Sequence, residues 1–268
     1  MGLSILNNIP SLEAQNQLAM TNTQLQNTLF QLSSGSKINS GADDPAGLSI
    51  ADGLQANISA LTQSAQNVTD GVGMLQTADG ALSQVTTLLN RAVTLATEAA
   101  NGGLSTSQLS ALDNEYQSIQ AEITRIGGQT TFNGSSVFTA STTSIFLGSA
   151  TNSIGVTIGT LSATTLALNT TSLTASTAAT ALDAINAAVE SVASSRGTLG
   201  ATLNRLTAAQ NVISNQVTNI TSAENLIRAA NIPEDVAEES QLSVLEQTGI
   251  SALTQANTQS QQILRLFQ

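Results

Sequence analysis

Apolar residues recur every three to four positions along most of the chain, which is the spacing of one face of an α-helix. The clearest stripe is large at its ends and small in its middle: Leu242, Leu245, Gly249, Ala252, Ala256, Gln259, Ile263 and Leu266. An apolar helix face needs a partner, and small residues let two backbones approach closely. The sequence therefore predicts a C-terminal helix that packs tightly against another helix.

A second stripe lies near the N-terminus, where Leu18, Leu25 and Leu32 recur every seven residues. The core positions expected between these leucines are half polar: Gln15, Asn22 and Leu29. A helix with such a stripe buries too little apolar surface to be stable alone. We therefore expect the two terminal helices to pair with each other or with copies in neighbouring molecules.

Turn and capping residues divide the region between the two ends. Asp44 and Pro45 supply an N-cap and a first-turn proline for a helix that runs to about Ala100. Its stripe is predicted to shift in phase near Asp79, as at a stutter. Asn101 and the two following glycines end this helix.

Two more helices and a short β region are expected further along. The first helix runs from about Thr106 to Ile126 and is closed by Gly127 and Gly128, and the second starts near Ser176 and continues toward Leu226. Pro233 then interrupts the chain before the C-terminal stripe. Between these two helices a β-hairpin is predicted, from the Asn133-Gly134 turn signal and from apolar runs at 144–147 and 154–158.

Composition narrows the fold and the chemistry. Of the 268 residues, 41% are hydrophobic but only 2% are aromatic, which favours long thin helical packing over a thick core. Without His or Cys there is no thiolate, zinc-protease or Ser-His-Asp chemistry, so we expect no enzyme activity, no cofactor and no metal site. The net charge of −11 argues against nucleic acid and an anionic membrane as partners, because both would be repelled. No signal peptide or membrane-spanning run is recognised.

Several motifs together resemble bacterial flagellins. LSSGSKINSGADDPAGLSI at 32–50 is similar to the family's N-terminal signature, and NRAVTLATEAANG at 90–102 and QAEITRIGGQTTFNG at 120–134 are similar to later segments. The Arg-x-x-Leu-Gly-Ala-x-x-Asn-Arg-Leu pattern occupies 196–206, and VLEQTGISALTQANTQSQQIL resembles the C-terminus. The resemblance covers nearly everything outside about 136–180, so the variable middle of the family is very short here.

The resemblance implies a mainly α fold with two domains that are each made from both halves of the chain. Residues 1–40 and 235–268 would form a discontinuous terminal coiled-coil domain, and 41–135 with 181–234 an elongated helical rod domain. Residues 136–180 would be a short variable segment with a small β-hairpin region. The Ser and Thr residues from Thr139 to Thr180 suggest O-glycosylation as a hypothesis.

The resemblance also implies a secreted structural subunit of the flagellar filament, exported without a cleaved signal peptide for swimming motility. Its partners would be copies of itself, the export apparatus, a secretion chaperone that binds the C-terminal segment, the filament cap and the hook junction. Predicted residues of inter-subunit packing are Leu18, Leu25, Leu32, Lys37, Asp43, Asp44, Arg91, Leu95, Glu115, Leu245, Gly249, Ala252, Ala256, Ile263 and Leu266.

Some of these residues have alternative interpretations. Capping alone explains Asp44 and Pro45, whereas Lys37, the only lysine, could form a salt bridge to an acid of an adjacent subunit. Arg91, Leu95 and Glu115 fall on the rod surface that, by resemblance, stacks on the next subunit and that Toll-like flagellin receptors recognise. Thr94 stands where many receptor-activating flagellins have Glu, which favours packing over receptor recognition.

Two other classes of protein stay open. A hook-associated protein of the hook-filament junction shares flagellin-like ends but is needed in few copies. A soluble coiled-coil secreted effector would be a stable monomer with fully helical ends.

Overall fold

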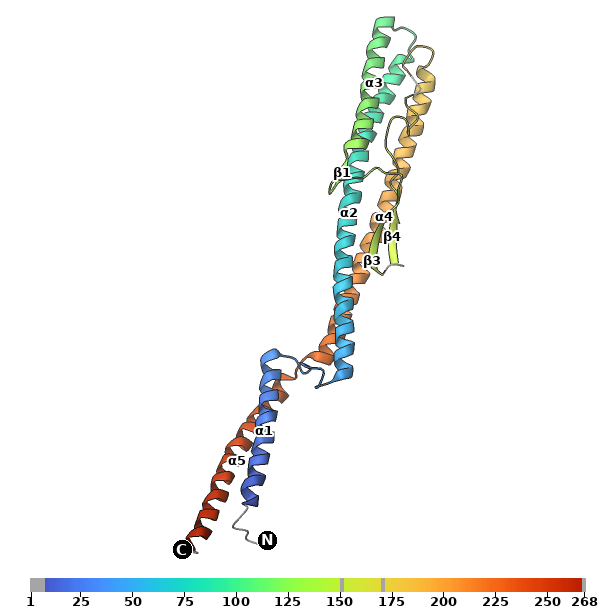
Figure 1. Cartoon of the computed structure of the whole chain (residues 1–268). Coiled ribbons are helices and arrows are strands. Elements are labelled where there is room, and N and C mark those ends of the chain that lie inside the picture. The colour runs from blue at the N-terminus through green and yellow to red at the C-terminus, as the bar shows by residue number, and fades with distance from the viewer. Residues whose placement is uncertain (1–7, 150–151, 170–171, 267–268) are drawn as a thin grey trace. The chain divides into compact units, whose positions relative to one another are not determined.

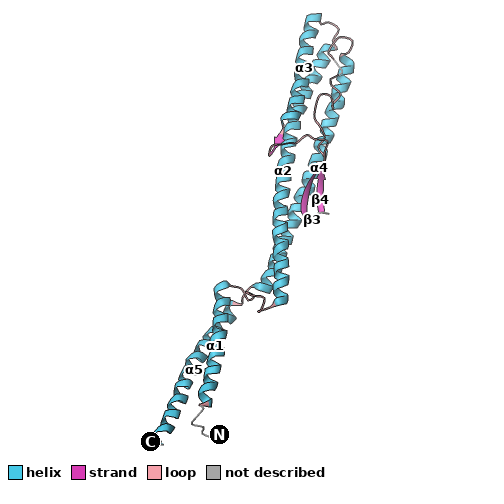
Figure 2. Cartoon of the chain, in the orientation of Figure 1, coloured by secondary structure: helices cyan, strands magenta, loops and turns pink. Residues whose placement is uncertain are grey.

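A computed structural model describes residues 8–149, 152–169 and 172–266, and for 149, 260 and 263–266 it describes the main chain alone. The described residues are mainly helical, as predicted (Figure 2). The helices are α1 (Ile9–Ser34), α2 (Pro45–Ala99), α3 (Thr106–Gln129), α4 (Ala178–Arg228) and α5 (Ile232–Leu266). The strands are β1 (Thr131–Phe132), β2 (Ser135–Ser136), β3 (Thr143–Ser149) and β4 (Asn152–Val156).

The chain folds into two compact units. The first joins residues 1–58 to 219–268, and the second comprises residues 59–218. In the first unit α1 and α5 lie side by side, which confirms the expected pairing of the terminal helices within one chain (Figure 1). The second unit holds one continuous core that draws on α2, α3, α4, the β3–β4 hairpin and the segment between β4 and α4.

Local capping explains where the helices begin and end. The Asn8 side chain accepts the Ser11 N–H at 3.2 Å to start α1, and Gly35, at φ 68°, ends it in the left-handed conformation. Asp44 Oδ1 accepts the N–H groups of Ala46 and Gly47 at 3.1 and 2.9 Å, which confirms the predicted N-cap of α2. At α3, Ser105 forms a capping box with Gln108.

The predicted end of α3 is wrong. Gly127 and Gly128 lie inside this helix, which continues to Gln129. Gly127 is buried because the backbone of Leu161 crosses it: a Cβ at this position would overlap the Leu161 carbonyl oxygen and lie 2.8 Å from its carbonyl carbon. The glycine therefore serves a close approach of two backbone segments and not a helix end.

The buried stripe of α2 continues without the predicted stutter. Leu75, Ala78, Leu82 and Val85 are all buried, at alternating spacings of three and four residues that carry the stripe past Asp79. Ala78 occupies the stripe position between Leu75 and Leu82, where the sequence has no large apolar residue. Beyond Asp79 the buried apolar residues of α2 are Leu82, Val85, Leu89, Ala92, Leu95, Ala96 and Ala99.

The described residues form two β-hairpins where the sequence predicts one. Asn133 (φ 49°) and Gly134 (φ 78°) make the two-residue turn between β1 and β2, and both have the positive φ that such turns favour. In the second hairpin Ile145 pairs with Ile154, and the register shifts between Phe146 and Ser149. The buried side chains of Ile145, Ile154 and Val156 join the core of the second unit.

The described residues between β4 and α4 form no helix or strand, yet they are anchored to α3. Leu168 and Leu173 are buried, and the Leu168 carbonyl accepts Gln120 Nε2 at 2.9 Å. The Leu173 N–H donates to Asp113 Oδ1 at 2.7 Å. These contacts fix a Ser/Thr-rich segment whose apolar residues complete the core.

Candidate functional site: the paired terminal helices and the rod surface

The antiparallel pairing of α1 with α5 is set by contacts along its length. Asn8 Nδ2 donates to the Ala256 carbonyl at 3.1 Å, and Ser11 Oγ donates to Asn257 Oδ1 at 3.0 Å. A Cβ on Gly249 would lie 3.2 Å from Leu18 Cδ1. Residue numbers therefore rise along α1 as they fall along the facing part of α5. Gly249 lies at a close contact of the two helices.

The seam between α1 and α5 follows a different register from the predicted one. On α1 the seam positions that alternate with the leucines are Ala14, Thr21 and Thr28. Gln15 and Leu29, which the sequence predicts there, are exposed. Thr21 and Thr28 are buried, and their hydroxyls donate to the carbonyls of Gln17 and Gln24, four residues back, at 3.0 and 3.1 Å. With its hydroxyl satisfied inside its own helix, a buried threonine fills the narrow space between two close helices.

On α5 the seam contains acidic residues that the apolar pattern did not reveal. Its buried and half-buried positions are Asp235, Glu239, Leu242, Glu246, Gly249, Leu253 and Ala256. Leu245, 45% exposed, and Ala252 lie outside this seam. The facing helix α1 has no basic residue, so these three carboxylates find no cation on it. The seam is therefore weakly stabilised.

The predicted packing residues of the terminal helices divide into three groups. Leu18, Leu25, Leu32, Gly249 and Ala256 are half-buried in the seam. Leu245 and Ala252 are exposed. The side chains of Ile263 and Leu266 lie outside the described residues.

Sequence reasoning missed a second apolar face on α1. Ile9, Leu12, Met20 and Phe30 are 57 to 61% exposed, and helical spacing places them on the side of α1 opposite the seam. On this face the polar residues Asn16, Thr23 and Asn27 lie between them, so these four never form a periodic stripe. Single exposed apolar residues are ordinary, but four large ones on one face indicate a contact surface.

The loop between α1 and α2 is ordered by its own polar residues. Asp43 Oδ2 accepts the N–H groups of Asn39 and Ser40 at 3.0 and 2.8 Å, and these bonds lower the pKa of the Asp43 carboxyl below its ordinary value. The Lys37 N–H donates to the Arg228 carbonyl at 2.8 Å. The exposed Lys37 ammonium forms no ion pair within the part of the chain that the structure describes.

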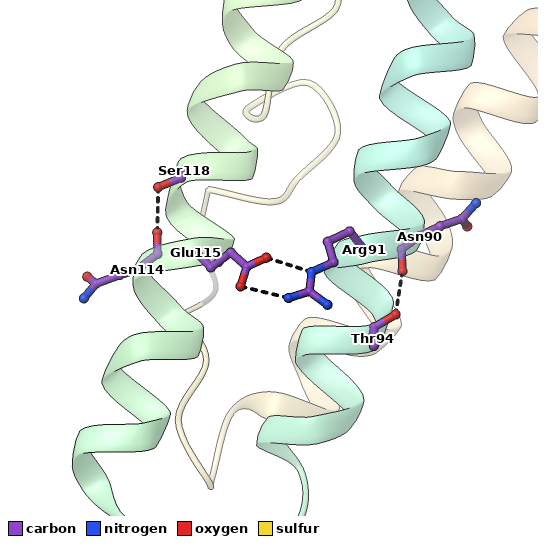
Figure 3. Close-up of polar contacts among 6 residues, drawn as sticks. All are labelled: Asn90, Arg91, Thr94, Asn114, Glu115 and Ser118. Atoms are coloured by element: carbon purple, nitrogen blue, oxygen red, sulfur yellow. Dashed lines mark hydrogen bonds and ion pairs between the residues drawn. The ribbon is translucent and has the colours of Figure 1, made fainter.

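In the second unit, an ion pair joins two of the predicted rod residues. Arg91 on α2 and Glu115 on α3 point toward each other, with Nε to Oε1 at 2.7 Å and Nη2 to Oε2 at 3.0 Å (Figure 3). This bidentate contact lowers the pKa of Glu115 and raises that of Arg91. Both side chains are about half exposed, so the pair forms part of a surface.

Leu95 does not belong to that surface. Its side chain is 0% exposed and packs in the core of the second unit. The prediction that Leu95 faces another subunit is therefore wrong, because the side chain is enclosed by its own unit. Thr94, one residue earlier, is exposed and donates its hydroxyl to the Asn90 carbonyl at 3.1 Å (Figure 3).

Neither a metal-ion cluster nor a membrane-spanning helix is found among the described residues. No group of three or more His, Cys, Asp or Glu side chains is placed to hold a metal ion among them. Within the same ranges, no helix has the length and hydropathy needed to cross a membrane.

Comparison with known proteins identifies the family. The model of the bacterial flagellin N-terminal helical region matches residues 5–143, and that of the C-terminal helical region matches residues 182–267. B-type flagellin of Pseudomonas aeruginosa is 42% identical over 151 residues, which are 56% of this chain and 31% of that protein. Flagellin of Escherichia coli (strain K12) is 42% identical over 137 residues, 51% of this chain and 28% of that protein.

A solved structure agrees with these matches. The crystal structure of Bacillus cereus flagellin is similar with a TM-score of 0.50 and 31% identity, and the match covers 59% of this chain and 94% of that one. The alignments to the curated relatives span less than a third of those proteins. With both helical regions matched and a flagellin as structural neighbour, this chain belongs to the bacterial flagellin family.

Proposed function

We propose that this protein is a structural, non-enzymatic subunit that polymerises with copies of itself into an extracellular flagellar filament for motility. The observation that carries the proposal is the second apolar face of α1, the four exposed residues opposite the seam. In a polymer, a neighbouring copy would cover this face. The two relatives named above are flagellins, which favours a filament subunit over a hook-filament junction protein.

The weakness of the α1–α5 seam supports the same proposal. Half-buried carboxylates without a facing cation, and threonines in place of large apolar residues, give the pair little stability of its own. Contacts that exist only in the assembled state would stabilise it by mass action. A chain with labile ends also suits export in an unfolded form.

For the filament we keep the predicted domains: residues 1–40 with 235–268 as the inner coiled coil, 41–135 with 181–234 as the rod, and 136–180 as the variable segment. Exposed members of the predicted packing set are proposed to contact neighbours, namely Lys37, Asp43, Asp44, Arg91, Glu115, Leu245 and Ala252. Lys37 would pair with an acid of an adjacent subunit, a modest contact if exposed.

Other partners are proposed from the family: the export apparatus, a chaperone for the C-terminal segment, the filament cap and the hook junction. For the surface around the Arg91–Glu115 pair, stacking on the next subunit is proposed ahead of recognition by a Toll-like receptor, because residue 94 is Thr.

Seeded polymerisation tests the proposed function. Protein refolded from denaturant is added to short sheared filaments of the same chain and followed by light scattering and negative-stain microscopy. Long filaments whose mass grows with added subunit support the proposal, and a variant truncated after Ala230, which lacks α5, should not elongate the seeds. Protein that stays monomeric, or that stops after a few copies, would contradict it.

A further inference from the structure

We propose that Met20 is a modification site: oxidation of its thioether to the sulfoxide by a peroxide prevents the subunit from joining the filament. This inference rests on the proposed polymerisation and adds a chemical control to it. Oxygen transfer from hydrogen peroxide breaks the O–O bond, forms the S–O bond and releases water, so that sulfur is oxidised by two electrons and peroxide is reduced.

The position of Met20 makes its sulfur accessible before assembly. Its side chain is 59% exposed in the folded chain, on the face of α1 opposite α5. Met74, in contrast, is half-buried and packs against the core of the second unit. Met1, the third methionine, lies outside the described residues. Exposure governs the rate at which a thioether reacts, so Met20 should react before Met74.

The same face carries almost no charge that would repel a second copy. The chain has a net charge of −11, yet Glu13 is the only charged residue in the 26 residues of α1. Leu12 and Phe30, which share the face with Met20, are 59 and 61% exposed. A nearly neutral, partly apolar face on an acidic molecule suits contact with another copy of this chain.

Oxidation would change this contact from apolar to polar. A sulfoxide carries a strong acceptor oxygen, whereas the thioether of Met20 needs no hydrogen-bond partner when a second copy covers it. Burial of a polar group without a hydrogen-bond partner is unfavourable. We expect the critical concentration for elongation of seeds to rise by about tenfold.

The experiment treats refolded monomer with hydrogen peroxide, quenches it, and measures both the critical concentration on untreated seeds and the oxygen gained by each methionine peptide in mass spectrometry. Each variant is compared with its own untreated sample. Peroxide should impair wild type and Met74→Leu alike, but should leave Met20→Leu at its untreated value. Met20→Gln, which is polar without oxidation, should elongate poorly from the start.

A second measurement compares the filament with the monomer. Met20 should gain oxygen more slowly in assembled filaments, and methionine sulfoxide reductase should restore elongation of oxidised wild type. Equal loss of elongation in treated wild type and Met20→Leu, or equal oxidation of Met20 in filament and monomer, would overturn the inference. If untreated wild type does not elongate seeds at all, the proposed polymerisation itself fails.

Discussion

Adding one methyl group at Gly127 should destabilise the second unit, although alanine normally favours a helix. The new Cβ would overlap the Leu161 carbonyl oxygen and lie 2.8 Å from its carbonyl carbon, whereas unstrained carbon contacts lie at about 3.5 to 4.0 Å. The Leu161 backbone would thus have to move by roughly 1 Å. This movement is resisted because Leu161 and Ala163 are buried and the Ala163 N–H donates to Thr124 Oγ1 at 3.1 Å.

The size of the effect follows from two opposing terms. Overpacking against backbone costs about 3 kcal/mol, and replacing glycine by alanine inside a helix returns about 1 kcal/mol. Gly127→Ala should therefore lower the free energy of unfolding by about 2 kcal/mol. For a unit of this size that corresponds to a fall in Tm of about 4 to 8 °C, measured by circular dichroism of the full chain.

The adjacent glycine provides the matched control. A Cβ on Gly128 meets nothing within 4 Å, and this residue is exposed in the same helix. Gly128→Ala keeps the helix-propensity gain without the overlap, so Tm should rise by about 2 to 4 °C. If both variants shift Tm in the same direction, the close crossing of α3 by the Leu161 segment is refuted.

Three further predictions concern the helix seam and the ion pairs. Gly249→Ala should assemble nearly normally, because its Cβ would lie 3.2 Å from the flexible Leu18 Cδ1. Gly249→Leu should destabilise the α1–α5 pair by about 1 to 3 kcal/mol and slow seeded growth. Equal growth of the two variants would contradict this. Because Arg91 lowers the folded-state pKa of Glu115, this carboxylate stabilises the fold above its ordinary pKa of 4.5, and the contribution is lost as pH falls through the lowered value. Glu115→Gln should therefore lose less stability than wild type on acidification below about pH 4.5, and parallel curves in pH-dependent denaturation would argue against it. The Arg196–Asp79 pair, at 2.8 Å with both side chains about two-fifths exposed, should contribute only about 0.5 kcal/mol in a double-mutant cycle, and a coupling above about 2 kcal/mol would contradict that.

Helix starts were predictable because they depend on local chemistry. Asp44 caps α2 through N–H groups two and three residues ahead, and such a contact needs no knowledge of the rest of the fold. Gly127 resembles a helix end in sequence, but the structure uses its missing side chain to admit a segment more than thirty residues away. A glycine that makes room for another segment is indistinguishable in sequence from one that ends a helix.

The faces of the helices were harder to predict than their bounds. Apolar periodicity favours large residues such as Leu182 and Val189, but the structure buries their neighbours Ala181 and Ala188 more deeply. Likewise Thr21 and not Asn22 is buried in the seam. Where helices approach closely, the smallest residue occupies the centre and the large one lies at the flank, so a hydropathy pattern is displaced by one position.

The contacts that hold the chain ends together also constrain the order of folding. In the α1–α5 pair, hydrogen bonds join residues 248 and 246 positions apart, namely Asn8 with Ala256 and Ser11 with Asn257. In the second unit, the contacts of Arg91 with Glu115 and of Gln120 with Leu168 close loops of only 24 and 48 residues. Loop closure costs entropy that grows with length, and high contact order slows folding. The second unit can therefore form before α5 is available, but α1 has to wait for α5, which begins only at Ile232, before the two helices can pair.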